Sequence, residues 1–128
     1  MSRRVGEQLA GNKVLRLPVA AGAKIYEGDI VALNAQGYAA KAGKAENLVT
    51  AGAAKEYIDN TLGEDGAEHI LVQRGVFILA NSGDIEETDL LKTCYFAGSD
   101  SVTLTSAGSS AAGKIYSVEG GTVAVEMI

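Results

Sequence analysis

The segment Gly108-Ser109-Ser110-Ala111-Ala112-Gly113-Lys114 has the residue types of a phosphate-binding loop. In such a loop, backbone amides hold the phosphates, the lysine reaches their outer oxygens, and a following Ser or Thr holds Mg²⁺. Here Ile115 follows the lysine, and residues 115–118 are typical of a strand, whereas the loop needs a helix whose N-terminus faces the phosphates. We interpret the segment as a flexible Gly/Ser/Ala hairpin loop and predict that the protein neither binds nor hydrolyses ATP.

His69 is the only histidine and Cys94 is the only cysteine of the chain. A site built from two histidines is therefore excluded, and no Asn or Asp is evident that would orient a Cys–His nucleophilic pair. The apolar neighbours Leu90, Leu91 and Phe96 predict that Cys94 is a buried small hydrophobic residue. The sequence therefore predicts no catalytic pair, no structural disulfide, no metal and no cofactor.

Four acidic residues, Asp59, Glu64, Asp65 and Glu68, surround a glycine-containing turn and offer carboxylate oxygens that Ca²⁺ prefers. Their positions do not follow the alternating ligand spacing of a calcium loop. We predict a solvated polar turn and no metal site.

Composition limits the class of protein and of partner. The chain has 128 residues, 47% hydrophobic and 21% charged, which is typical of one globular domain. Its net charge is −5 and its basic residues are scattered, so a nucleic-acid partner is not expected. No apolar run reaches the length of a membrane span, and the N-terminus lacks the apolar core of a secretion signal, so we expect no membrane partner and production in a cytosol-like setting.

The apolar residues are small: the chain has 16 Gly, two Phe and no Trp. Small side chains bury little apolar area, so the core is predicted to be thin. We therefore expect a modestly stable protomer that gains stability when a partner or a second protomer covers more surface.

Strand-length segments rich in Val, Ile, Thr and Tyr run through most of the chain, and Gly, Asn, Asp and Ser separate them. They cover residues 14–17, 24–26, 30–33, 38–40, 48–58, 70–80, 94–96, 101–105, 114–118 and 122–127. Residues 34–37 and 119–121 are typical of hairpin turns. The segment 70–78 is apolar on both faces, which predicts a central strand with a bulge at Gly75. One short helix is predicted near Glu86 to Leu91, with Asp84 as its cap. The expected fold is all-β, a small barrel or sandwich with one short helix and an extended N-terminal arm.

A series of landmarks between Ala51 and Phe96 carries a family resemblance. In order they are Tyr57, the turn 63–66, Arg74-Gly75-Val76-Phe77, Asn81-Ser82-Gly83, Thr88-Asp89-Leu90 and Cys94-Tyr95. Upstream they are joined by Leu17-Pro18-Val19 and the segment 25–33, and downstream by a closing strand at 123–127. In this order and spacing the landmarks resemble the capsid decoration (cement) proteins of tailed phages, over nearly all the chain after the first dozen residues.

The resemblance implies a structural protein of the virion that is not an enzyme. Such a protein is made in the bacterial host cytoplasm and binds the outer surface of the expanded icosahedral shell. It stabilises the shell by bridging major capsid protein subunits, and it forms a homo-oligomer, a trimer or a dimer. The alternative that the sequence leaves open is a cytosolic β-barrel-like binding module for a small ligand or peptide.

The predicted domain organisation is a flexible N-terminal arm at 1–13 and a single β-rich decoration domain at 14–128. The arm is polar and has too few large apolar residues to pack as an element of its own. Arg3 and Arg4 are adjacent on an otherwise acidic protein, and Val5 and Leu9 can each fill a small apolar pocket. These four residues are the predicted capsid-binding residues, and the alternative is a solvated tail without a role.

Overall fold

The computed structural model describes residues 13–127, and it is mostly strand with a single 3-10 turn. Strands make up 50% of it and helix 3%, and five strands form a closed barrel, so the predicted all-β class is confirmed. The arm residues Arg3, Arg4, Val5 and Leu9 lie outside the described residues.

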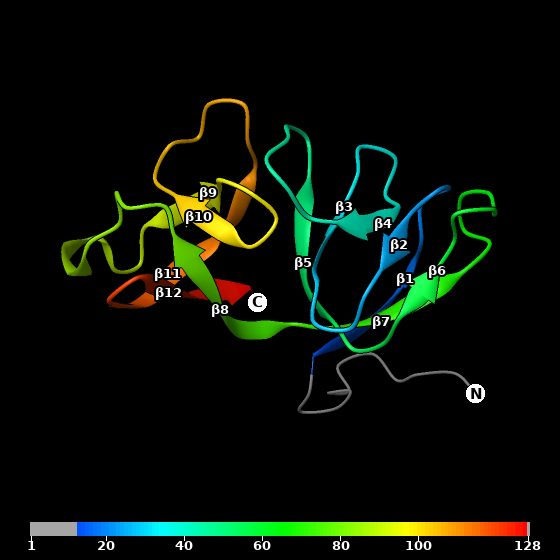
Figure 1. Ribbon diagram of the computed structural model, residues 1–128, viewed down its shortest axis with the longest axis horizontal. Helices are drawn as coiled ribbons and strands as arrows, with labels where there is room; N and C mark the ends of the chain where they lie inside the picture. The colour runs from blue at the N-terminus through cyan, green and yellow to red at the C-terminus, as the bar shows by residue number, and fades with distance from the viewer. Residues whose placement is uncertain (1–12, 128) are drawn as a thin grey trace, which may run out of the picture.

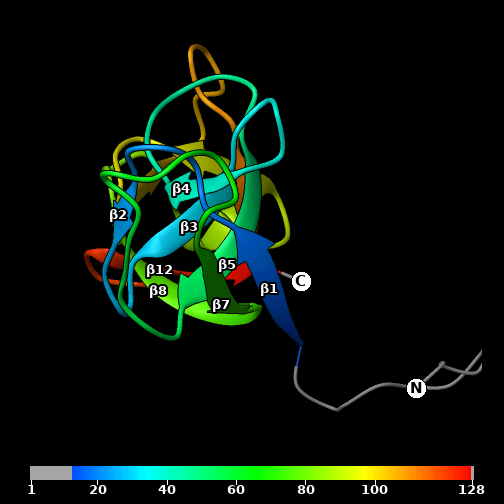
Figure 2. The same cartoon turned by 90° about the vertical axis from the view of Figure 1, so that its right-hand side faces the viewer.

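The first part of the chain forms a five-stranded antiparallel sheet, with strand order β1-β7-β5-β3-β4. Its strands are β1 (Val14–Pro18), β3 (Ile30–Leu33), β4 (Ala39–Lys41), β5 (Val49–Ala54) and β7 (His69–Gln73). A separate two-stranded ribbon, β2 (Lys24–Ile25) with β6 (Ile58–Asp59), lies beside it. In the end-on view, β2 and β1 lie on opposite sides of the molecule (Figure 2).

The second part of the chain forms the barrel, in the order β10-β8-β12-β11-β9. Its strands are β8 (Gly75–Asn81), β9 (Thr93–Phe96), β10 (Ser101–Thr103), β11 (Ala111–Glu119) and β12 (Thr122–Met127), and η1 (Glu87–Asp89) precedes β9. Barrel and sheet lie side by side along the long axis of the molecule (Figure 1).

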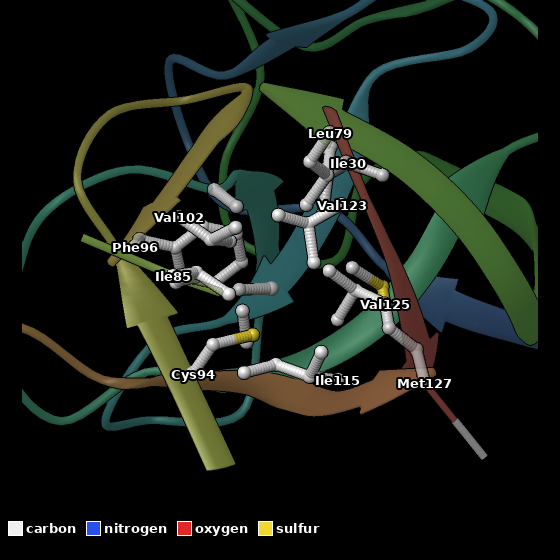
Figure 3. Packing of buried hydrophobic residues seen from close by; sticks show 13 residues of the cluster. Ile30, Leu79, Ile85, Cys94, Phe96, Val102, Ile115, Val123, Val125 and Met127 are labelled. Atoms are coloured by element: carbon white, nitrogen blue, oxygen red, sulfur yellow. The ribbon is translucent and has the colours of Figure 1, made fainter. Parts of the chain in front are cut away.

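Two clusters of buried side chains form the core. The barrel cluster includes Phe96, Val102, Ile115, Val123 and Val125, whose side chains converge inside the barrel (Figure 3). The sheet cluster consists of eight residues: Val19, Ile25, Val31, Ala39, Ala51, Ala54, Ile70 and Val72. Among the described residues, Phe96 is the only aromatic side chain that is fully buried, which agrees with a core of small residues.

Strand β3 belongs to both clusters. Ile30 and Ala32 pack in the barrel cluster, whereas Val31 between them packs in the sheet cluster. Successive side chains of a strand point to opposite faces, so a run of apolar residues is what a strand between two cores requires.

The predicted long strand at 70–80 is two strands, which meet at Arg74. β7 is paired on both edges, with β1 and β5, so this half is an interior strand as predicted. β8 then leaves the sheet and enters the barrel. No register shift occurs at Gly75, whose partner is Met127, so the predicted bulge is wrong. The apolar character of 70–78 reflects two different environments.

The single helical element also differs from its prediction. It spans only Glu87–Asp89 and Glu86 precedes it, so Asp84 is not its cap. The carboxylate of Asp84 instead accepts hydrogen bonds from Thr103 Oγ1 (2.6 Å), Leu104 N (3.0 Å) and Ser82 Oγ (2.9 Å). These bonds, above all that of Thr103, lower the pKa of Asp84. The acid ties the loop before η1 to β10.

Both predicted hairpin turns are confirmed. Asn34 Oδ1 accepts the amides of Gln36 and Tyr38, and Gly37 has the positive φ (91°) expected of it. The second turn joins β11 to β12, with Glu119 opposite Thr122.

Gly52 lies at the place where β5 passes close to the β7–β8 junction. Its φ is +152°, and a Cβ atom there would overlap the carbonyl oxygen of Gln73. The obstacle is backbone, which cannot rotate away as a side chain can.

We predict that Gly52→Ala lowers the free energy of unfolding by about 2 kcal/mol or more, because the overlap forces β5 and β7 apart. Gly43→Ala is the matched control, since a Cβ at Gly43 meets no atom within 4 Å. Denaturant titration followed by circular dichroism measures both. Equal stability of the two variants would contradict the proposed close approach.

Candidate functional site

The phosphate-loop-like segment does not form a phosphate site. Ala111–Glu119 is strand β11, so the strand predicted after the lysine is confirmed. Lys114 is paired in register with Glu126 of β12, and Ile115 is fully buried in the barrel. A lysine in the middle of a strand has no helix N-terminus beside it, so the arrangement that holds a phosphate is missing here.

The serines of this segment have structural roles. Ser110 Oγ donates to Ala45 O (2.6 Å) and accepts from Leu48 N (3.0 Å), and Ser109 Oγ donates to Phe96 O (2.6 Å). The expectation of a flexible loop is therefore wrong for these residues. Ser110 fixes the segment before β5 to the barrel, and Ser109 fixes the loop before β11 to β9.

The structure keeps the two candidate nucleophilic residues apart. His69 begins β7 in the sheet, whereas Cys94 is fully buried in β9 of the barrel, so the buried thiol is confirmed. Burial raises the pKa of Cys94 from 9.0 to about 11. Among residues 13–127, no group of three or more His, Cys, Asp or Glu side chains is placed to hold a metal ion.

The acidic turn after β6 is exposed, as predicted, and its organising residue was not predicted. Glu64, Asp65 and Glu68 are exposed. Asn60 beside them is buried, and its Nδ2 lies within hydrogen-bond distance of Val19 O (3.2 Å), Ala20 O (3.0 Å) and Glu64 O (3.0 Å). The only signal in the sequence is an Asn at the start of a turn, which is too common to identify a buried amide.

An exposed aromatic pair lies on the β2–β6 ribbon. The rings of Tyr26 and Tyr57 are 5.1 Å apart between centroids and inclined at 44°, and both are about half exposed. Lys24 Nζ lies 6.0 Å from the Tyr26 ring. Leu62, in the loop that follows β6, is fully exposed. We call Lys24, Tyr26, Tyr57, Asp59 and Leu62 the aromatic patch.

The charges of the aromatic patch are fixed at neutral pH. Tyr26, followed by Tyr57 and Asp59, raises the pKa of Lys24. Hydrogen bonds from the hydroxyl and amide of Thr61 lower the pKa of Asp59. The patch thus presents a leucine and two tyrosines, the latter enriched in protein–protein contacts, beside one cation and one anion.

A second apolar group lies beside η1, and we call Leu90, Leu91 and Tyr116 the leucine patch. All three are exposed, Leu91 by 71%. Leu91 also has a positive φ of 70°, which is uncommon for a bulky residue, and its amide donates to Ile115 O (2.8 Å). A strained backbone that presents a leucine to solvent favours a contact role over a packing role.

The two patches lie at opposite ends of the molecule. The ribbon strand β6 and its loop are at the right-hand end of Figure 1, and the turn η1 is at the left-hand end, beyond the barrel. A single protomer can therefore contact two different neighbours at once.

Comparison of the chain with protein-family models, with curated proteins and with solved structures finds no match. Within residues 13–127, the only helical element is far too short to span a bilayer.

We predict that Cys94 resists iodoacetamide in the native protein at neutral pH. The raised pKa alone reduces its thiolate fraction about 100-fold, because each pKa unit is a factor of ten. Mass spectrometry of protein labelled with and without denaturant measures the difference. Equal labelling rates in the two conditions would show that the barrel opens around β9.

Proposed function

We propose that this protein is a phage capsid decoration protein, which binds the outer surface of the expanded icosahedral shell and bridges major capsid protein subunits. The observation that carries the proposal is the pair of exposed patches at opposite ends of an elongated all-β molecule. The order of sequence landmarks that resembles this family supports it. In this proposal the protein is not an enzyme and uses no cofactor.

The aromatic patch and the leucine patch supply the binding free energy in this scheme. A buried tyrosine removes roughly 150–250 Å² from water, and apolar area contributes about 25 cal/mol per Å². Three tyrosines and three leucines are thus a suitable centre for two contacts of ordinary size, about 1,600 Å² each. Bridging two subunits opposes their separation when packed DNA presses the shell outward.

The N-terminal arm is the third contact that we propose. Arg3 and Arg4 bind an acidic surface of a neighbouring subunit of the shell, and Val5 and Leu9 occupy apolar pockets on it. Ordering the arm costs about 1–2 kcal/mol per residue, so several of these contacts must form together. The copies on the shell form a homo-oligomer, which agrees with a core of small residues.

A second candidate function, a binding module for a small ligand or peptide, is favoured by one cleft. The cleft has a volume of about 520 Å³ and lies between the start of β5, the start of β11 and the end of β12. Arg74 lines it, and the Nε atom of Arg74 is buried without a hydrogen-bond partner among the described residues. A buried donor without a partner is unfavourable, and the guanidinium group of Arg74 is the kind of group that binds a carboxylate ligand.

We predict that particles carrying the protein release their DNA at a higher temperature than particles assembled without it. Leu91→Asn and the double variant Tyr26→Ser/Tyr57→Ser are each expected to reduce capsid occupancy about tenfold or more, since each removes the apolar centre of one contact. Occupancy is measured by quantitative gel analysis of purified particles, and DNA release by dye fluorescence during heating.

Leu91→Asn separates binding from folding, because Asn accepts a positive φ more readily than Leu, so the variant should be as stable as the wild type or more stable. Val49→Asn is the control, since Val49 is exposed but lies in β5, between the two ends. Equal release temperatures with and without the protein would leave the binding module as the better candidate.

Deletion of residues 2–12 is predicted to leave the melting temperature nearly unchanged and to weaken capsid occupancy. The described strands begin after this segment, so its loss removes no strand pairing described here. Full occupancy by the truncated protein would show that the β-domain alone attaches to the shell.

A further inference from the structure

Strand β8 has one paired edge and one largely open edge. Along one edge, Gly75 to Ala80 pair with β12. Along the other, only Ala80 and Asn81 pair, with β10. Among the described residues, Val76 to Leu79 therefore have no strand partner on this second edge.

The backbone groups that face the open edge can be identified from their neighbours. The amides of Ala80 and Ser82 donate toward β10, to Asp100 O (2.9 Å) and Val102 O (3.0 Å), whereas Asn81 donates to Gly121 O on the β12 side. Backbone groups alternate sides along a strand, so Val76 and Ile78 point their N–H and C=O groups to the open edge.

A cleft runs along this edge, and we call it the β8 groove. It has a volume of about 440 Å³. One wall is Phe77, Ile78 and Leu79, and the opposite wall comes from the β2–β3 turn and the sheet. Ile78 is 66% exposed, and Val76 on the same face is exposed as well. The groove thus combines open backbone groups with apolar side chains, which is the requirement for adding an extended segment as a new strand.

The β8 groove is acidic. Its ionisable residues are Glu27, Asp29, Asp100 and Lys41. Asp29 is already engaged, since its carboxylate accepts the Tyr26 amide (2.9 Å) and lies 3.8 Å from Lys41 Nζ. Glu27 and Asp100 have no ion-pair partner among the described residues, so the groove carries an excess of negative charge.

We propose that the β8 groove binds the N-terminal arm of a second copy of this protein, as a strand added to the open edge of β8. Arg3 and Arg4 of the arm pair with Glu27 and Asp100, and Val5 packs against Ile78. Only in the arm are two basic residues adjacent in this sequence, and an apolar residue follows them directly. In this proposal the acidic surface that the arm binds belongs to a second copy of this protein, in place of the shell subunit proposed above.

The acidic walls also oppose pairing of the open edge with the β8 edge of a second copy. An exposed apolar edge strand is a risk for edge-to-edge association. Two β8 edges brought together would place Glu27 and Asp100 of both copies near one another, and like charges in a contact are strongly unfavourable. A basic segment is instead attracted by these carboxylates.

The position of β1 favours exchange between copies over binding within one chain. Lys13 O accepts the Arg74 amide (2.8 Å), so the arm leaves the domain at the β7–β8 junction. The β2–β3 turn forms part of the groove's wall, and β2 and β1 lie on opposite sides of the molecule (Figure 2). An arm from its own chain must turn back around the junction to reach the groove. The arm of a neighbouring copy, with a reach of about 40 Å when extended, is free of this constraint.

The test uses a peptide of residues 1–12 and purified full-length protein. The protein should self-associate in sedimentation equilibrium, and free peptide should compete with this association. The groove variant Glu27→Arg/Asp100→Arg and the arm variant Arg3→Glu/Arg4→Glu should each weaken association about tenfold or more, because each brings like charges together. Mixing the two variants should restore association, since the charges are again opposite.

Glu64→Arg/Glu68→Arg is the matched control, with the same charge change on the exposed turn after β6, and it should associate as the wild type does. A second probe is backbone amide exchange, in which Val76 and Ile78 should gain protection as concentration rises. Protection that is independent of concentration would overturn the proposal in favour of the protein's own arm. The proposal would also be overturned if the charge changes in the groove left association unchanged, or if the protein were a monomer that does not bind the peptide. None of these results depends on the capsid, so the proposed function stands or falls separately.

Discussion

The fold depends on a sheet that is apolar on both faces. Ile30 and Ala32 of β3 contribute to the barrel cluster and Val31 to the sheet cluster, and in β5 Ala53 and Ala54 divide in the same way. A slip of one residue would exchange the two faces, so both clusters together fix the register. The irregular pairing between Val31 and Ala32, opposite Gly52 and Thr50, accommodates one extra residue, Ala51, at the place where the two strands adjust to both cores.

The open edge of β8 follows from this arrangement. One continuous apolar run forms β7 in the sheet and then β8 in the barrel. At Arg74 the chain therefore leaves the sheet strands β1 and β5 and begins to pair with the barrel strands. Gly52 permits the crossing because β5 must pass against the Gln73 carbonyl there. Ser110 then fixes the barrel to the segment before β5, and Ser109 bonds to β9 within the barrel. These connections between the two parts hold the aromatic and leucine patches far apart.

Local features were predictable from the sequence, and features set by two distant segments were not. The turn at Asn34–Gly37 and the buried Cys94 follow from residue type and local sequence, although two of the apolar neighbours used for Cys94, Leu90 and Leu91, are exposed. The break at Arg74 cannot be predicted in this way. The sequence of an apolar run looks the same whether the run forms one strand of one sheet or two strands in different cores. The sequence position of Asp84 fits a helix cap, yet its hydrogen-bond partner Thr103 lies on a strand 19 residues away. The two patches could not be predicted from the sequence for a related reason. The sequence does not distinguish an exposed Leu91 from a buried one, and the positive φ that exposes Leu91 is visible only in the fold.

In the proposed function the protein acts mechanically, by holding two neighbouring capsid subunits at once. Its most direct test is a cryo-electron microscopy reconstruction of particles with and without the protein, at a resolution that separates side chains. The account predicts difference density on the outer shell that contacts one capsid subunit through Tyr26 and Tyr57 and another through Leu91. Density that touches the shell through only one end, or no density at all, would contradict it.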